Sequence, residues 1–234
     1  MTLFESFLNG YEPQPISSPV LWKGAPVGLL LDPGHGIRQY TSGKRSPDGR
    51  LIEGEWNRET AARLIPDLRL MGIDARCIVP EDQDIKLEDR AARANKIIRA
   101  EPDKKWFYLS IHLNAANKKD CDKNGWCKRA SGVVVYASTN ASDTSKAWAK
   151  TMVGAAHRFG LKGDRSMPKE GYWTAGWYVI RCTKMPAILT ESLFMTNPDE
   201  VDFLLSERGK ETIANMHFAG LCDFFGLPYA HVIG

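Results

Sequence analysis

The chain has 234 residues, of which 43% are hydrophobic and 25% are charged, and this predicts one globular domain with a full core. Its formal net charge of +3 is too small to indicate a nucleic-acid-binding protein, although it is compatible with an anionic polymer as substrate. No apolar run approaches the roughly 20 residues that span a bilayer. The first residues lack the basic start and long apolar stretch of a secretory signal, so we expect a protein kept in the cytoplasm unless another device exports it.

Strands and helices are expected to alternate along most of the chain. Residues 1–26 contain four prolines and many turn formers, which predicts an arm lying over a domain of residues 27–234. In chain order we expect a strand at 27–31, a helix at 55–71, a strand at 74–79, a helix at 86–99, strands at 106–111 and 132–136, a helix at 143–159, strands at 177–182 and 187–191, and helices at 199–205 and 208–225. This alternation predicts a single α/β domain with a mostly parallel central sheet and helices on both faces.

Two segments conflict with that pattern. Pro66 lies inside the first expected helix, where an interior proline costs roughly 3 kcal/mol, so we expect a kink or an early break there. Residues 160–176 contain several glycines and aromatic residues without a clear period. We expect them to form a loop near the functional site.

Three of the expected strands end in a side chain suited to metal or acid–base chemistry. The first apolar strand stops at Pro33 and Gly34, and His35 follows directly. His112 ends a second strand and Glu191 a third. Because open α/β sheets keep their ligand sites at the carboxyl ends of the strands, we expect the three side chains to share one site.

The two histidines favour a zinc site. A lone histidine after a strand is more often a hydrogen-bonding loop residue, but His35 and His112 with an acid between them resemble a ligand set. A catalytic zinc has three protein ligands and leaves one position for water. The third ligand can be Glu53 or Glu55, which periodicity does not separate, although Glu55 also suits the first turn of a helix, where the dipole favours acids.

These motifs together resemble the zinc-dependent N-acetylmuramoyl-L-alanine amidases of the family-3 type. That family has a strand ending in a DPGHG-like turn, an acid four residues before an asparagine at a helix start, an S-I-H-x-N-A strand end, and P-A-x-L-x-E followed by phenylalanine and N-P. The resemblance extends over roughly residues 27–225, in the family's order, through the following residues: Asp32, Pro33, Gly34, His35, Gly36, Glu53, Asn57, Ser110, Ile111, His112, Asn114, Ala115, Pro186, Ala187, Leu189, Glu191, Phe194, Asn197 and Pro198.

The resemblance implies that His35, Glu53 and His112 bind Zn²⁺ and that Glu191 is the catalytic acid. It favours Glu53 over Glu55, because Glu53 has the family's offset to the asparagine at the helix start. The implied activity is a peptidoglycan hydrolase that cleaves the amide bond between N-acetylmuramic acid and the L-alanine of the stem peptide. Zinc lowers the pKa of bound water to about 7, and a neighbouring carboxylate can take the proton and return it to the departing amine.

Four further residues are candidates for contacting substrate or for supporting a ligand. Asp32 precedes the first histidine of the site, and Asn114 lies two residues beyond the second. Trp126 belongs to a long basic loop at 116–131, which is either a substrate contact or a solvated surface loop. Arg181 is the arginine that would pair with the acid at 191 if that acid were structural.

The five cysteines are expected to be free thiols. An odd number cannot all pair, and a cytoplasmic origin favours the reduced form. Cys121 and Cys127 lie in the same loop and can bridge only after export.

The loop at 43–49 also resembles a subset of the family found in phage endolysins. We therefore expect an endolysin that is made in the cytoplasm of the producing cell and acts on the wall after release, rather than a bacterial recycling enzyme. The alternatives are a zinc hydrolase of another amide or peptide substrate and a non-catalytic cell-wall-binding module. The complete ligand set with Glu191 argues against the binding module. We expect a monomer whose partner is peptidoglycan, with no nucleic-acid partner and no membrane insertion.

Overall fold

A seven-stranded sheet forms the centre of the computed structural model, which describes residues 16, 18–37 and 44–229. The elements are β1 (Leu21–Trp22), β2 (Ala25–Pro33), α2 (Glu53–Leu70), β3 (Asp74–Cys77), α3 (Leu87–Ala100), β4 (Lys105–Asn114), η1 (Lys118–Asp120), β5 (Val133–Ser138), α4 (Asp143–Arg158), β6 (Trp173–Ala175), α5 (Tyr178–Cys182), β7 (Ala187–Phe194), α6 (Pro198–Leu205) and α7 (Glu207–Phe225). The strand order is β1–β2–β4–β7–β5–β6, and β3 also pairs with β2.

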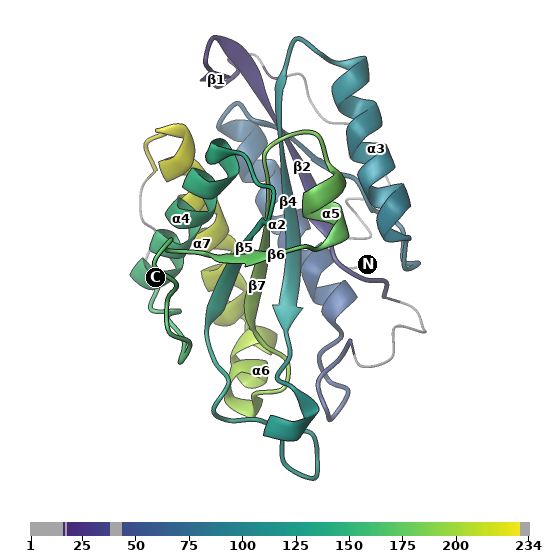
Figure 1. Cartoon of the computed structure of the whole chain (residues 1–234), viewed down its shortest axis with the longest axis vertical. Coiled ribbons are helices and arrows are strands. Elements are labelled where there is room, and N and C mark those ends of the chain that lie inside the picture. The colour runs from purple at the N-terminus through teal and green to yellow at the C-terminus, as the bar shows by residue number, and fades with distance from the viewer. Residues whose placement is uncertain (1–15, 17, 38–43, 230–234) are drawn as a thin grey trace.

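The sheet is mostly parallel. Four of its six strand pairings are parallel, and only β1 with β2 and β5 with β7 are antiparallel. Helices α2, α4 and α7 cover one face, while α3 and α5 cover the other (Figure 1). The predicted α/β fold class is therefore confirmed.

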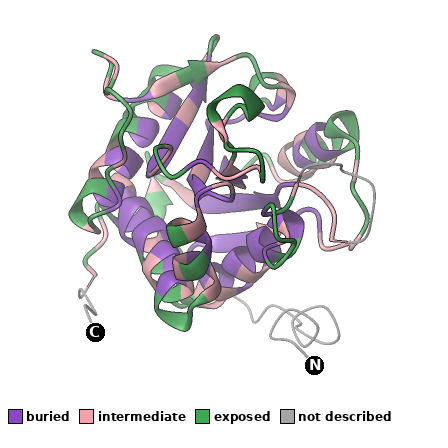
Figure 2. Ribbon diagram, turned by 90° about the horizontal axis from the view of Figure 1, so that it is seen from below, coloured by how far each residue is buried: buried purple, intermediate pink, exposed green. Residues whose placement is uncertain are grey.

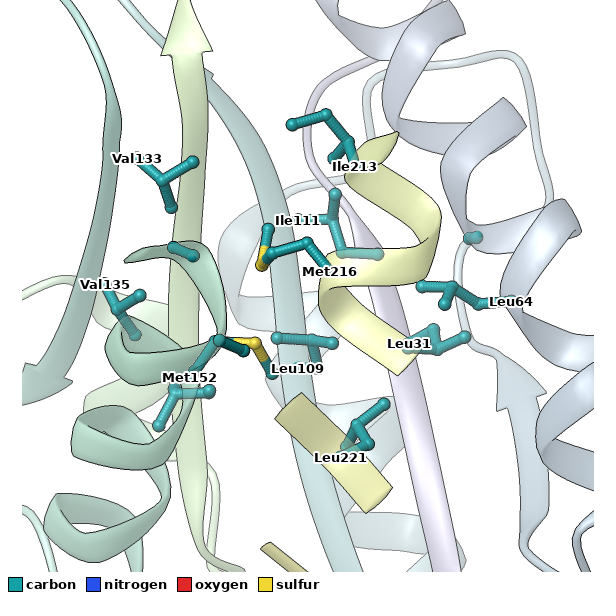
Figure 3. Close-up of a cluster of buried hydrophobic side chains, with 14 of the residues drawn as sticks. Leu31, Leu64, Leu109, Ile111, Val133, Val135, Met152, Ile213, Met216 and Leu221 are labelled. Atoms are coloured by element: carbon teal, nitrogen blue, oxygen red, sulfur yellow. The ribbon is translucent and has the colours of Figure 1, made fainter. Parts of the chain in front are cut away.

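Both faces of the sheet are buried, which explains the continuous apolar runs in the sequence. Along β2, Leu29 and Leu31 belong to the cluster under α2, α4 and α7, while Leu30 faces α3 and α5. Figure 2 shows the buried strands inside a layer of helices whose outer surfaces are exposed. Figure 3 shows Met216 and Leu221 of α7 lying against the β2 and β4 side chains.

The prediction of a strand at 177–182 is wrong, because this segment forms the short helix α5. Its neighbours Val179 and Ile180 are both buried, whereas Trp177 and Arg181, four residues apart, are both exposed. That pattern fits a helical turn, since a strand would point adjacent side chains to opposite faces. The expected loop at 160–176 also contains the short strand β6, whose three residues are too few to show a period.

Of the kink or early break expected at Pro66, the early break is wrong, since α2 continues to Leu70. Leu64, Ile65 and Leu68, on either side of the proline, are fully buried in the core. Their burial outweighs the roughly 3 kcal/mol that an interior proline costs.

Most of the predicted arm at 1–26 lies outside the described residues. Its described end includes β1, and Trp22 stacks on Phe224 with ring centroids 4.9 Å apart. All five cysteines are free thiols. Across the described residues no helix is both long and apolar enough to cross a bilayer.

His217 joins α7 to β7 inside the protein. Its Nδ1 donates to the Ile213 carbonyl at 2.8 Å, and its Nε2 then accepts from the Thr190 hydroxyl at 2.9 Å. Burial lowers the pKa of His217 from 6.5 to about 4. The hydrogen bond to Ile213 raises this pKa, but its effect is smaller than that of burial. The folded protein therefore takes up a proton less readily than the unfolded chain between pH 6.5 and 4. The stability that neutral His217 contributes is present above pH 6.5 and is lost as the pH falls towards 4.

Replacing His217 with Gln should remove this part of the pH dependence. We expect the free energy of unfolding of the unmodified chain to fall by up to about 3 kcal/mol more than that of the variant between pH 7 and pH 4. Urea unfolding at a series of pH values measures the free energy of unfolding of the unmodified chain and of the variant. Equal slopes against pH in the two proteins would contradict the assignment of a buried neutral imidazole.

Candidate active site

The carboxyl ends of β2, β4 and β7 meet the start of α2 at the end of the sheet marked by the β4 arrowhead in Figure 1. His112 on β4 lies directly beside Glu191 on β7 in the parallel register. His35 follows β2, and Glu53 is the first residue of α2. Tyr108 and Leu189 pack on the face of the sheet that α5 covers. Because every second residue of a strand lies on the same face, the side chains of His112 and Glu191 also lie on this face, beyond the end of α5.

His35, Glu53 and His112 form a compact group. Glu53 Oε1 lies 3.1 Å from His112 Nδ1 and 3.5 Å from His35 Nε2, and one ligand atom from each residue lies within 4.8 Å of the others. The Glu53 side chain is 1% exposed, against 17% for His35 and 16% for His112. The carboxylate therefore lies beneath two imidazoles that reach the surface of the site.

This donor set fits a zinc ion. The backbone N–H of Leu113 donates to Glu53 Oε1 at 3.1 Å, but Glu53 Oε2 is buried without a hydrogen-bond partner among the described residues. A buried unpaired carboxylate oxygen is costly unless a cation or donor satisfies it. Two imidazole nitrogens and one carboxylate oxygen are a common catalytic zinc set. Other metals bind the same ligands, so the donor set indicates a divalent cation and favours zinc.

The structure brings Glu53, and not Glu55, to the histidines. Glu55 is exposed. On a helix, residues two apart point to different sides, so only one of the two acids can face the site.

Burial and the short contacts shift the pKa values of these groups in different directions. For Glu53, burial raises the pKa, but the hydrogen bond and charge of His112, together with the charges of His35 and Lys44, more than reverse this and hold it below its ordinary value. For His112, burial lowers the pKa, but the hydrogen bond and charge of Glu53, together with the charges of Glu191 and Asp32, outweigh this and raise it. Burial lowers the pKa of His35 to about 4, which keeps this imidazole in the neutral form that binds metals.

Glu191 has the properties of an acid–base group. Burial raises the pKa of its carboxyl to about 7, although the neighbouring His112 acts in the opposite direction. Its Oε2 is buried with no hydrogen-bond partner in the described part of the chain. A carboxyl with a pKa near 7 can both accept and donate a proton at neutral pH.

The remaining sequence candidates lie in different surroundings. Asn114 Nδ2 is buried at the end of β4 and has no hydrogen-bond partner within the described ranges. Trp126 is half-buried and packs against the core cluster under α2, α4 and α7. Arg181 is exposed on α5, and within residues 44–229 no ion pair joins it to Glu191. Of these three, only Asn114 presents a buried polar side-chain atom without a partner among the described residues.

The turn that carries His35 is held in an uncommon backbone conformation. His35 has φ +61°, and a side chain at Gly34 would lie 2.1 Å from the His112 ring. Asp32, 1% exposed, accepts hydrogen bonds from Arg90 at 2.7 Å and Tyr108 at 2.7 Å. These hydrogen bonds to Asp32 therefore fix the buried end of β2 from which the turn begins.

Two fully buried arginines bind the backbone of this turn. Arg58 Nη1 donates to the His35 carbonyl at 2.6 Å and to the Gly54 carbonyl at 2.8 Å. Arg90 Nη1 donates to the Pro33 carbonyl at 2.8 Å, and its Nη2 to the His35 carbonyl at 3.4 Å. Neither arginine could be predicted from the sequence, because an arginine on an amphipathic helix is usually exposed and nothing in the local sequence marks these two as buried.

If His35, Glu53 and His112 hold a metal ion, replacing Arg58 with Met should weaken its binding by about 10- to 100-fold, the range typical of residues that hold a metal ligand in place. The variant leaves the His35 carbonyl without its short hydrogen bond and frees the strained turn. Competition with a chelator measures the affinity, and Arg99→Met, on the exposed side of α3, is the matched control. Unchanged affinity in a folded Arg58→Met protein would contradict this role. If Arg58→Met does not fold, Arg58→Lys gives the same comparison with the charge kept.

Comparison with known proteins relates this chain to amidases. The family described as N-acetylmuramoyl-L-alanine amidase (Amidase_3) matches residues 29–223. The probable cell wall amidase LytH of Staphylococcus aureus is 24% identical over 197 residues, which are 84% of this chain and 58% of LytH. The chain thus spans less than two thirds of the length of this relative.

Solved structures share the fold. The N-acetylmuramoyl-L-alanine amidase from Clostridium difficile 630 has a TM-score of 0.69 and 28% identity, covering 86% of this chain and 97% of that one. Ami1, the N-acetylmuramyl-L-alanine amidase from Mycobacterium smegmatis, has a TM-score of 0.70 and 19% identity, covering 89% and 99%. At the latter identity the likeness is one of fold alone.

Proposed function

Because this chain belongs to the N-acetylmuramoyl-L-alanine amidase family, we propose that it hydrolyses peptidoglycan at the amide bond between N-acetylmuramic acid and the L-alanine of the stem peptide. The observation that carries the proposal is the convergence of His35, Glu53 and His112 beside Glu191 at one end of the sheet. Three possible ligands and an acid–base group are what zinc-assisted amide hydrolysis requires.

Each side chain has a distinct part in this proposal. His35, Glu53 and His112 would hold a zinc ion, which when bound supplies an activated water and polarises the scissile carbonyl. Glu191 takes the proton of the attacking water and returns it to the nitrogen of the departing L-alanine. The unpaired Nδ2 of Asn114 is available to donate a hydrogen bond to a substrate oxygen.

Digestion of purified peptidoglycan tests the activity. New amino termini on L-alanine, which disappear with a chelator and return when zinc is added, are the expected result. New reducing ends of sugars, or cleavage of a different peptide bond, would contradict the proposed bond. Activity that is indifferent to chelators would contradict the proposed metal.

We further propose that the protein is a monomeric phage endolysin that reaches the wall from the cytoplasm at lysis. The support is the likeness of the loop at 43–49 to endolysin sequences; Gly43 lies outside the described residues. Bacteria that express the protein should lyse only when their membrane is permeabilised, and turbidity of the culture measures this. Lysis without permeabilisation would contradict the proposed release.

A further inference from the structure

A cluster of two aromatic rings and one guanidinium lies diagonally across strands β5 and β7 from Glu191, on the side away from the histidines. In the antiparallel pairing of β5 with β7, Val134 lies directly opposite Glu191. Tyr136 is two residues further along β5 and so shares a face with Val134. Diagonal neighbours of this kind are about 7–8 Å apart across two strands, which is within the reach of one substrate group.

The rings of Tyr136 and Trp177 pack against each other. Their centroids are 4.4 Å apart with an interplanar angle of 51°. Trp177 is the residue that precedes α5, and 38% of it remains exposed, which makes it one of the few large hydrophobic residues at the surface of the described chain. Tyr136 and Trp177 therefore form a partly exposed aromatic surface at the start of α5.

Arg165 adds a cationic edge to this surface. Its Nη1 donates to the Tyr136 hydroxyl at 3.2 Å, and its side chain is exposed. Arg165 lies in the segment between α4 and β6, and three separate parts of the chain thus converge on the same side of Glu191.

We propose that Tyr136, Trp177 and Arg165 form a subsite for an N-acetylated hexose of the glycan strand, an inference that rests on the proposed function. The flat C–H face of a pyranose is apolar and matches an aromatic surface, while its hydroxyl and acetamido oxygens accept hydrogen bonds from a guanidinium. The scissile bond joins a sugar substituent to a peptide, so the sugar must lie on one side of the catalytic residues. The aromatic side is the one with the matching chemistry.

Binding measured without turnover tests the subsite. In the full chain carrying Glu191→Gln, a tetramer of N-acetylglucosamine, which has no peptide, and a stem tripeptide, which has no sugar, are titrated separately by calorimetry. The tetramer should bind, and adding Trp177→Ala should weaken its affinity about tenfold or more. The tripeptide affinity should not change. Leu70→Ala, which alters an exposed residue of α2, is the control.

Several results would overturn the proposal. Equal affinity for the tetramer with and without Trp177→Ala would remove the sugar subsite, and a loss confined to the tripeptide would assign the surface to the stem peptide instead. If Trp177→Ala does not fold, Trp177→Leu and Arg165→Met give the same comparison. In the active chain, Trp177→Ala should raise KM for peptidoglycan more than it lowers kcat. The titrations involve no hydrolysis, so they test sugar binding even if the protein does not cleave the proposed amide bond.

Discussion

Replacing Glu191 with Gln should lower the turnover of peptidoglycan by about a thousandfold, within the range that general acid–base groups contribute. Glutamine keeps the shape of the side chain but cannot take a proton from water or return it to the leaving amine. The zinc content should not change, because the structure groups His35, Glu53 and His112, and not Glu191, as the possible ligands. Release of L-alanine termini and metal analysis of the same sample measure the two effects.

Glu200 provides a matched control for this experiment. Burial raises its pKa to about 7 as well, but its carboxylate accepts hydrogen bonds from the backbone N–H groups of Gly132 at 2.8 Å and Phe194 at 2.7 Å. Glu200→Gln should therefore lower thermal stability and leave the turnover of the folded protein almost unchanged. Loss of zinc in Glu191→Gln would mean that Glu191 is a ligand, and nearly full turnover would mean that another group is the base.

The second large effect concerns the metal. Replacing Glu53 with Ala should reduce zinc affinity by more than the 10- to 100-fold that is typical of residues that only support a ligand. The variant removes the one carboxylate of the group and leaves two imidazoles, which cannot complete a three-ligand site. Glu55→Ala, at an exposed position two residues away, should bind zinc as the unmodified protein does.

Chelator competition and metal analysis after dialysis measure both variants, and circular dichroism checks that each is folded. Full zinc retention by Glu53→Ala would contradict its place in the site. Loss of zinc by Glu55→Ala instead would reverse the choice between the two acids. Equal loss in both variants, with both folded, would show that the start of α2 supports the site without providing a ligand.

The strand ends could be predicted from local patterns, because an apolar run followed by a proline and a glycine, as after β2, is legible in the sequence. The choice of Glu53 over Glu55 needed the family resemblance, since periodicity does not separate two acids that lie two residues apart where a helix begins. Burial then separates them physically, with one under the imidazoles and the other in solvent. Local sequence patterns do not show which of the two acids is buried.

Features that depend on long-range packing could not be predicted. Arg58 and Arg90 reach the same carbonyl from two helices, and only the folded chain shows that these guanidiniums are buried. The helix α5 was mistaken for a strand because five residues are too few for periodicity to distinguish the two. The cluster of Tyr136, Arg165 and Trp177 likewise joins side chains from three segments.

The proposed activity requires that side chains from three separate parts of the chain hold a single metal ion. A crystal of the protein grown with zinc, with data collected at the zinc absorption edge, tests it directly. We predict one anomalous peak about 2.0–2.2 Å from a nitrogen of His35, a nitrogen of His112 and an oxygen of Glu53, and no peak there in crystals of Glu53→Ala. A peak held by other residues, or no peak at this end of the sheet in a protein that cleaves peptidoglycan, would contradict the account.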